Sequence, residues 1–385
     1  MKRIPLLLKI VIAIALGVLL GQVMPAFGVR AMNTFCGLFD QLLKFLIPLI
    51  IVGLVTPAIA EVGSRAGRML LLTVGLAYGF TLFSGLFAYA FSTSLFPHLL
   101  NAGALAHLEA APVEYAPYFA VTVPPLMDVM TALVLAFMVG IGIAAFGAPS
   151  LQRGFCEFKA IVSQTISRVI IPLLPLYIFG IFLDMAAVGR VTAVLSAFVA
   201  IVAVIFAMTL VLLLMQYGLA GIVSRSNPLR QLRTMLPAYF TALGTSSSAA
   251  TIPVTHARTL KNGVTPSVAG FVVPLCATIH LSGSTLKITS CAVALMLMQG
   301  MDFSFMQMLG FVMMLGVTMV AAPGVPGGAI MAALGVLEGL LGFDSQQQTM
   351  MITLYIAMDS FGTACNVTGD GAIALIVERL AKKRE

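Results

Sequence analysis

Charged residues and tryptophan are scarce in this sequence. Only 9% of its 385 residues are charged, it has no Trp, and 60% of its residues are hydrophobic. Because a soluble globular domain carries about 25% charged residues, this composition excludes an ordinary soluble domain. Backbone polar groups inside a bilayer must be paired internally, and long apolar runs achieve this as helices. The composition therefore predicts an all-α integral membrane protein.

Two further patterns are missing. The five cysteines have no metal-ligand spacing and lie mostly in apolar segments, which predicts small buried residues rather than a disulfide framework. The formal net charge of +7 is not gathered in one basic stretch but is spread over short loops between apolar segments. We therefore expect membrane lipid around the protein and no nucleic-acid partner.

Apolar runs in the first part of the chain predict membrane helices at 5–23, 35–60, 69–96, 117–147, 160–187 and 190–223. The first run is too long for a signal peptide and has no small-residue cleavage site after it, so it is interpreted as a retained span. Lys and Arg favour one set of alternate loops, from Lys2 and Arg3 to the basic C-terminal "RLAKKRE". This asymmetry predicts a multi-pass protein of the inner membrane with both termini in the cytoplasm.

The sequence pattern changes after residue 225. Two segments there consist of short apolar pieces interrupted by turn-forming residues, "GTSSSAATIP" in the first and "APGVPGGA" in the second. Broken hydrophobic segments in matching positions of two halves indicate the binding site of a transporter. Two ordinary helices kinked at Pro and Gly are the alternative.

Polar and charged residues also lie inside the neighbouring apolar segments. In "CATIHLSGSTLKITSCA", His280 and Lys287 flank a Ser-Gly-Ser-Thr run, although a lysine at the bilayer centre costs roughly 2.5–3.5 kcal/mol on insertion scales. In the last apolar segment two carboxylates, an amide and a hydroxyl share one helical face: Asp359, Thr363, Asn366 and Asp370. Intramembrane acids face the interior of a helix bundle, so this face is a candidate functional site.

Four motifs carry a family resemblance. In chain order, "TSSSAATIPVT", "VVPLCATIHLSGS", "AAPGVPGGAIM" and "TACNVTGDGA" resemble the glutamate/aspartate transporter family, also called the dicarboxylate/amino acid:cation symporters, in a divergent bacterial-type form. The resemblance implies a homotrimeric elevator-type transporter with inverted repeats, eight transmembrane helices and two re-entrant helical hairpins. Scaffold helices are then expected mainly in 1–68 and 117–223, and a transport domain mainly in 69–96 and 225–385, with hairpins near 228–262 and 304–343.

The resemblance also assigns roles to single residues. Asp359 would hold the amino group of an amino acid substrate, and Asn366 would hold its carboxylate. The other substrate contacts would come from the last helix and the two hairpin tips: Gly362, Thr363, Ser246, Ser247, Ser248, Gly324, Val325 and Pro326. A coupling Na⁺ would be held by Asp370, Asn366, Cys276 and His280. No cofactor is expected, and Na⁺ or H⁺ is the expected coupling ion.

The sequence departs from the family pattern where charge matters for the substrate. Members that carry acidic substrates have an arginine in the last helix, where this chain has Gly362, or at the first hairpin tip, where it has Ser246. Because a planar guanidinium is the best partner of a carboxylate, a neutral amino acid is the expected substrate.

A second departure concerns the coupling ion. The usual Asn-Met-Asp-Gly-Thr of the broken helix reads "HLSGS" at 280–284, so Ser282 stands where a sodium-binding aspartate is expected. Lys287 and His280 are therefore candidates to replace cations that relatives take from solution. The sequence leaves open whether Lys287 pairs with Asp359 or Asp370. It also leaves open purely structural roles for both residues.

These features predict a secondary active amino acid transporter and not an enzyme, working by cation-coupled symport with reduced or altered sodium dependence. A sodium-independent or proton-coupled carrier of a dicarboxylate or other small carboxylate is the alternative, and a passive anion channel is a further one. An intramembrane serine hydrolase would use the serines of "GTSSS" with His280 as base, but it would leave two aspartates without a role.

Overall fold

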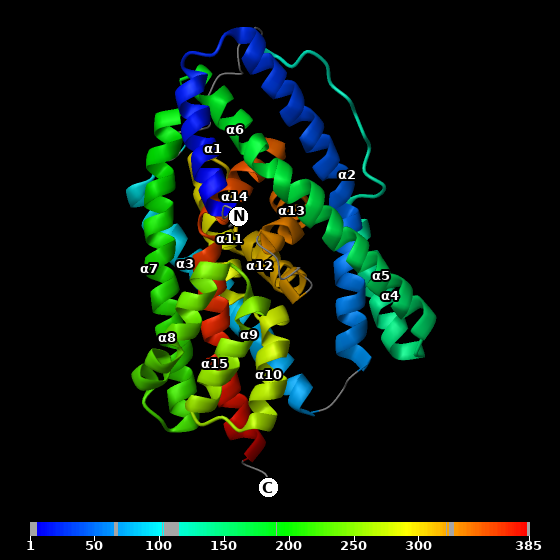
Figure 1. Cartoon of the computed structure of the whole chain (residues 1–385), viewed down its shortest axis with the longest axis vertical. Helices are drawn as coiled ribbons and strands as arrows, with labels where there is room; N and C mark the ends of the chain where they lie inside the picture. The colour runs from blue at the N-terminus through cyan, green and yellow to red at the C-terminus, as the bar shows by residue number, and fades with distance from the viewer. Residues whose placement is uncertain are drawn as a thin grey trace, which may run out of the picture.

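The computed structural model describes residues 6–64, 68–101, 103, 115–189, 191–320, 322 and 327–382, and in this part of the chain it contains helices, turns and loops but no strand. The helices form one elongated bundle (Figure 1). Within the described residues, five helical stretches are long and apolar enough to cross a membrane: Ala26–Pro57, Met69–Leu99, Pro149–Ala187, Ala197–Ser224 and Pro266–Gln299. The prediction of an all-helical membrane protein agrees with this architecture.

The first half of the chain consists mainly of long helices. They are α1 (Leu6–Gly21), α2 (Ala26–Ser64), α3 (Arg68–Leu99), α4 (Val129–Phe146), α5 (Pro149–Thr165), α6 (Ile171–Ala187) and α7 (Val191–Ser224). A single π-helical turn at Ile166–Ile170 joins α5 to α6. Five of the six predicted apolar runs are helical in the structure, so their apolar composition and length were sufficient to predict them.

The predicted run at 117–147 is wrong in its first third. Residues 117–128 are not helical, and α4 begins only at Val129, where the side chain of Asp128 accepts a hydrogen bond from Thr131 N. The segment contains three prolines, which lack the N–H that a helix interior needs. It lies along α2 (Figure 1), held by bonds such as Tyr118 N to Thr34 Oγ1 at 2.9 Å.

Shorter helices dominate the second half. They are α8 (Pro228–Thr245), α9 (Ser248–Lys261), α10 (Pro266–Ile279), α11 (Ser282–Gln299), α12 (Phe305–Val320), α13 (Gly328–Leu341), α14 (Ser345–Ala357) and α15 (Asp359–Lys382). α9 and α13 have 14 residues each, about 21 Å of helix, whereas the hydrocarbon core is about 30 Å thick. The pairs α8–α9 and α12–α13 occupy the ranges given above for the hairpins, and their re-entry into a membrane stays a prediction.

α15 is the helix around which the second half is arranged. It contacts α7, α8, α9, α10 and α11 along its length, and nearly all of its described residues are buried. Its first residue is Asp359, because α14 ends at Ala357 and the chain turns at Met358.

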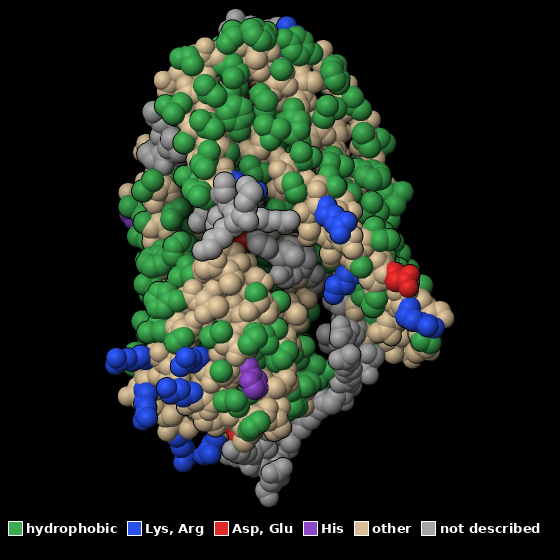
Figure 2. All heavy atoms as spheres, viewed as in Figure 1, with side chains coloured by type: hydrophobic (Ala, Val, Ile, Leu, Met, Phe, Trp, Pro, Cys, Tyr) green, Lys and Arg blue, Asp and Glu red, His purple; other side chains and the backbone are tan. Residues whose placement is uncertain are grey.

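Figure 2 shows a broad hydrophobic surface over the upper bundle and Lys and Arg gathered at the lower end, near the turn between α7 and α8. The break between α14 and α15, at Met358, lies inside the bundle, and the site described next begins there.

Candidate functional site

A small cavity lies where the turn between α8 and α9, the break between α10 and α11, and the starts of α13 and α15 come together. Its volume is about 30 Å³. It is lined by Ser246, Ser248, Ala277, Thr278, Leu281, Ser284, Ala322, Ala329, Tyr355, Asp359, Thr363 and Asn366. Ligand pockets usually measure about 300–1,000 Å³, so the surrounding helices nearly fill the site in this conformation.

Asn366 ties the broken helix to α15. Its Oδ1 accepts a hydrogen bond from Gly283 N at 2.8 Å, and its Nδ2 donates to Ser284 Oγ at 3.1 Å. Ser284 Oγ also accepts from the Tyr355 hydroxyl at 2.9 Å. A Cβ at position 283 would lie 2.7 Å from Gly362 O, so only glycine lets the two helices approach this closely. The break between α10 and α11 is thus held in place by α15 itself.

The serine turn forms the opposite wall. Ser246 adopts a left-handed conformation with φ of 49°, and its Oγ lies 2.8 Å from Ser360 Oγ. Ser247 caps α9 by accepting from Ala250 N, and Ser248 is the first residue of that helix. The N–H groups at a helix start favour an anion such as a carboxylate. Ser246 and Ser248 line the cavity, whereas Ser247 is used as a cap and does not.

Asp359 is held from two sides. Its Oδ2 accepts a hydrogen bond from Gly327 N at 2.8 Å, just before α13 begins. Its Oδ1 lies 3.7 Å from Lys287 Nζ. The predicted second tip residues Gly324, Val325 and Pro326 lie outside the described residues.

Lys287 is fully buried on α11 and points towards the start of α15. Its Nζ donates to Met358 O at 3.2 Å and lies 3.8 Å from the centre of the Tyr355 ring. Its head also lies where the side chain of residue 362 would begin, because a Cβ on Gly362 would overlap Nζ and Cε of Lys287. Lys287 does not line the cavity, but it stands directly behind Asp359 and Tyr355. Of the two aspartates left open by the sequence, its partner is Asp359.

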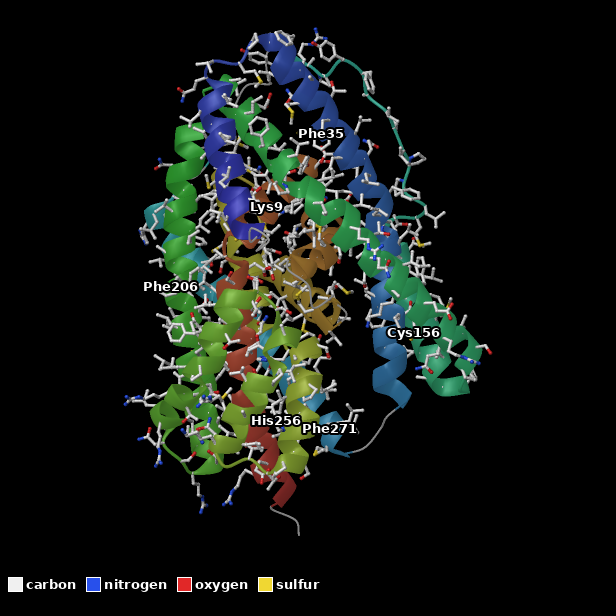
Figure 3. All side chains as sticks on the ribbon, in the orientation of Figure 1. Lys9, Phe35, Cys156, Phe206, His256 and Phe271 are labelled. Atoms are coloured by element: carbon white, nitrogen blue, oxygen red, sulfur yellow. The ribbon has the colours of Figure 1, made fainter. Side chains whose placement is uncertain are left out.

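Phe361, near the start of α15, lines an apolar pocket together with Met358 and residues of α7. It packs edge-on against Phe206 of α7, with ring centres 5.4 Å apart. Figure 3 labels Phe206 on the outer flank of the bundle. The lysine side chain itself is fully buried in this conformation.

His280 and Asp370 form a second buried pair, further along α15. His280 Nδ1 lies 2.9 Å from Asp370 Oδ1, and both residues are at most 1% exposed. Nearby, Gln216 of α7 donates to Ser282 Oγ at 3.1 Å. Within the described residues, His280 Nε2 and Gln216 Oε1 have no hydrogen-bond partner, although both are buried. His280 thus occupies one oxygen of the carboxylate that the resemblance assigns to a cation.

The remaining predicted cation ligands are placed as follows. Cys276 is buried one turn before the break, and its carbonyl accepts from His280 N at 2.8 Å. Asn366 is engaged with the broken helix, as described above. In the described part of the chain there is no group of three or more His, Cys, Asp or Glu that could hold a metal ion. A Na⁺ site built from carbonyl oxygens and Asp370 stays a prediction.

Two residues of the site, Tyr355 and Gln216, were missed at the sequence level. Tyr355 supplies both a ring beneath Lys287 and a hydroxyl to Ser284, yet it lies on α14, a different helix from Asp359. Gln216 of α7 contributes a side-chain amide that donates to Ser282 in the same region. The one available signal was a tyrosine four residues before an intramembrane aspartate, which a continuous helix would have placed on the same face.

The chain is similar in sequence to several amino acid transporters. The excitatory amino acid transporter 3 of Mus musculus is 36% identical over 163 residues, which is 42% of this chain and 31% of the relative. An excitatory amino acid transporter of Caenorhabditis elegans is 27% identical over 293 residues, 74% of this chain and 55% of the relative. The chain therefore spans only about a third to about half of the length of these relatives.

A bacterial relative aligns along nearly its whole length. The serine/threonine transporter SstT of Acinetobacter baumannii is 27% identical over 387 residues, 96% of this chain and 95% of the relative. The family model described as the sodium:dicarboxylate symporter family matches residues 6–380. The resemblance drawn from the four motifs is confirmed, and the protein belongs to the sodium:dicarboxylate symporter family.

Proposed function

We propose that this protein is a secondary active transporter that carries a neutral amino acid across the inner membrane. The observation that carries the proposal is the cavity beside α15, where Asp359 is the only charged residue among the described lining residues. A lone carboxylate suits the ammonium group of an amino acid, and the surrounding hydroxyls and Asn366 can donate to its carboxylate. The name of the Acinetobacter relative, which refers to serine and threonine, supports a neutral substrate.

We further propose symport with altered cation coupling. His280 lies against Asp370, so that carboxylate has an imidazole partner inside the protein and less need of a cation from solution. Ser282 supplies a hydroxyl to Gln216 where a second carboxylate would otherwise stand. Both features favour coupling to fewer sodium ions, or to protons, over the full sodium dependence that the family name describes.

A second substrate class has its own support. Both oxygens of Asp359 already face a donor, Gly327 N at 2.8 Å and Lys287 Nζ at 3.7 Å. A ligand without an amino group, such as a dicarboxylate or another small carboxylate, would leave those contacts in place. This alternative is the runner-up because the lysine ammonium stands behind the cavity wall and not in the lining.

The rest of the proposal follows from family membership. We propose a homotrimer in which residues 69–96 and 225–385 move against helices of 1–68 and 117–223, with both termini in the cytoplasm. The gathering of Lys and Arg at the lower end of the bundle, where the C-terminus lies, supports the cytoplasmic side for that end (Figures 1 and 2). A carrier is favoured over a hydrolase because His280 Nδ1 contacts Asp370 and its Nε2 has no hydrogen-bond partner within the described residues, so no described serine is paired with the histidine.

A thermal-shift screen of the purified protein tests the substrate class. The protein is melted with each amino acid and with several dicarboxylates, with and without sodium and at two pH values. A ligand that binds only the folded state raises the melting temperature, and neutral amino acids are expected to do so. Asp359→Asn, measured in parallel, should abolish the shift. Stabilisation by dicarboxylates alone, retained in that variant, would overturn the proposal.

A further inference from the structure

The ammonium group of Lys287 is the counter-charge that the structure offers to Asp359. Asp359 is 7% exposed, and within the described residues Lys287 is the only cationic side chain within ion-pair distance of it. A buried carboxylate without a partner is costly, by several kcal/mol even after relaxation. Lys287 therefore compensates the negative charge of Asp359 at the centre of the site.

Several groups of the protein contact Lys287 and hold its ammonium group in place. Its ammonium has a carbonyl acceptor in Met358, the face of the Tyr355 ring, and the carboxylate of Asp359. Gly362 leaves the space that the lysine head fills, since any side chain there would collide with it. Residues on three helices, α11, α14 and α15, thus combine around one tethered cation.

The separation of 3.7 Å between Lys287 Nζ and Asp359 Oδ1 is longer than a hydrogen bond, which spans about 2.7–3.2 Å. Asp359 therefore keeps hydrogen-bonding capacity on its cavity side, while Lys287 approaches from behind. The site is electrically balanced when it is empty, with one positive and one negative charge. It stays balanced when a zwitterion enters, because a zwitterion adds no net charge.

We propose that Lys287 is a tethered counter-ion that lets the empty carrier return across the membrane without a bound cation at Asp359. The inference rests on the proposed function, because it concerns a carrier that must cross the membrane loaded in one direction and empty in the other. Without Lys287, the empty carrier would have to move a buried, unpaired carboxylate. The loaded carrier would suffer less, since the ammonium of the substrate would then pair with Asp359.

The test compares two rates in proteoliposomes for the parent and Lys287→Met. Net uptake requires the return of the empty carrier, whereas exchange of labelled for unlabelled amino acid uses only loaded crossings. We expect the ratio of exchange to net uptake to rise about tenfold or more in Lys287→Met, since an unpaired buried charge costs at least the 1.4 kcal/mol that a factor of ten represents. Because both rates come from the same vesicles, the ratio does not depend on how much protein is inserted.

Lys9→Met is the matched control. Lys9 is an exposed lysine on α1 (Figure 3), far along the chain from the site, and its loss should leave the parental ratio unchanged. Lys287→Gln provides a second variant, because its amide keeps a donor for Met358 O but carries no charge. It should also raise the ratio, which keeps the test valid if Lys287→Met does not fold.

The outcomes separate this inference from the proposed function. A parent that exchanges neutral amino acids while both Lys287 variants keep its ratio overturns the tethered counter-ion alone. Equal losses of exchange and net uptake in those variants overturn it too, because they would show a merely structural lysine. A parent that exchanges no amino acid overturns the proposed function and this inference with it.

Discussion

Gly362→Ala is the substitution whose effect can be worked out most directly from the structure. The new Cβ would overlap Nζ and Cε of Lys287 and lie 3.2 Å from its Cδ. The lysine head must then leave Met358 O and the Tyr355 ring. The hydrogen bond contributes about 1.5–3 kcal/mol and the buried cation–π contact about 2 kcal/mol. Since alanine regains about 1 kcal/mol of helix propensity, the free energy of unfolding should fall by about 3 kcal/mol.

The effect of Gly362→Ala on the free energy of unfolding should change sign when the lysine head is absent. Leucine lacks the Cε and Nζ atoms of lysine, so in a Lys287→Leu background the two overlaps with residue 362 are gone and only a contact with a δ carbon is left. Gly362→Ala should there raise the free energy of unfolding, by up to about 1 kcal/mol from helix propensity. Denaturant unfolding of the purified protein in detergent measures all four corners of this double-mutant cycle.

Gly218→Ala on α7 serves as the control for the cycle. A Cβ at that position would meet nothing within 4 Å, so it should be tolerated equally with and without Lys287. If Gly362→Ala destabilises both backgrounds to the same extent, the lysine head does not occupy the space beside α15, and the account of that contact is refuted.

Three further predictions concern neighbouring contacts. His280→Asn should free Asp370 and make the melting temperature rise with sodium more than in the parent; an unchanged sodium response would contradict the assigned role of the imidazole. Tyr355→Phe should cost only the hydroxyl's hydrogen bond, about 1 kcal/mol, whereas Tyr355→Leu should cost about 2 kcal/mol more by removing the ring beneath Lys287; equal costs would argue against the cation–π contact. Asn366→Ala should lower unfolding stability by about 1–3 kcal/mol, because a buried backbone N–H loses its acceptor, and should abolish uptake; full transport by this variant would remove Asn366 from the site.

The sequence was informative where the signal is local. Hydrophobic run length identified most of the long helices, and the spacing of Asp359, Thr363 and Asn366 correctly placed these side chains on one face, where they line one cavity. The segment 117–128 was assigned wrongly because apolar composition outweighed its prolines, which prevent helix formation.

Pairings between helices could not be predicted in the same way. Lys287 is only seven residues from His280, yet the two contact different aspartates, Asp359 and Asp370, because α11 turns its charged residue towards the start of α15. Which aspartate each residue meets depends on the rotation and depth of packed helices, and sequence spacing does not encode that. Gly362 illustrates the same limit. From the sequence it is the position where relatives with acidic substrates have an arginine, whereas in the structure its lack of a side chain leaves the space that Lys287 fills.

The most direct test of the central claim is a competition experiment in proteoliposomes that contain the purified protein and unlabelled neutral amino acid. External labelled serine or threonine should enter by exchange, and other neutral amino acids should compete with it. Aspartate, glutamate and dicarboxylates should compete only weakly, because Asp359 is the only charged residue in the described cavity lining. Exchange that is blocked by dicarboxylates at lower concentrations than by any neutral amino acid would contradict the account.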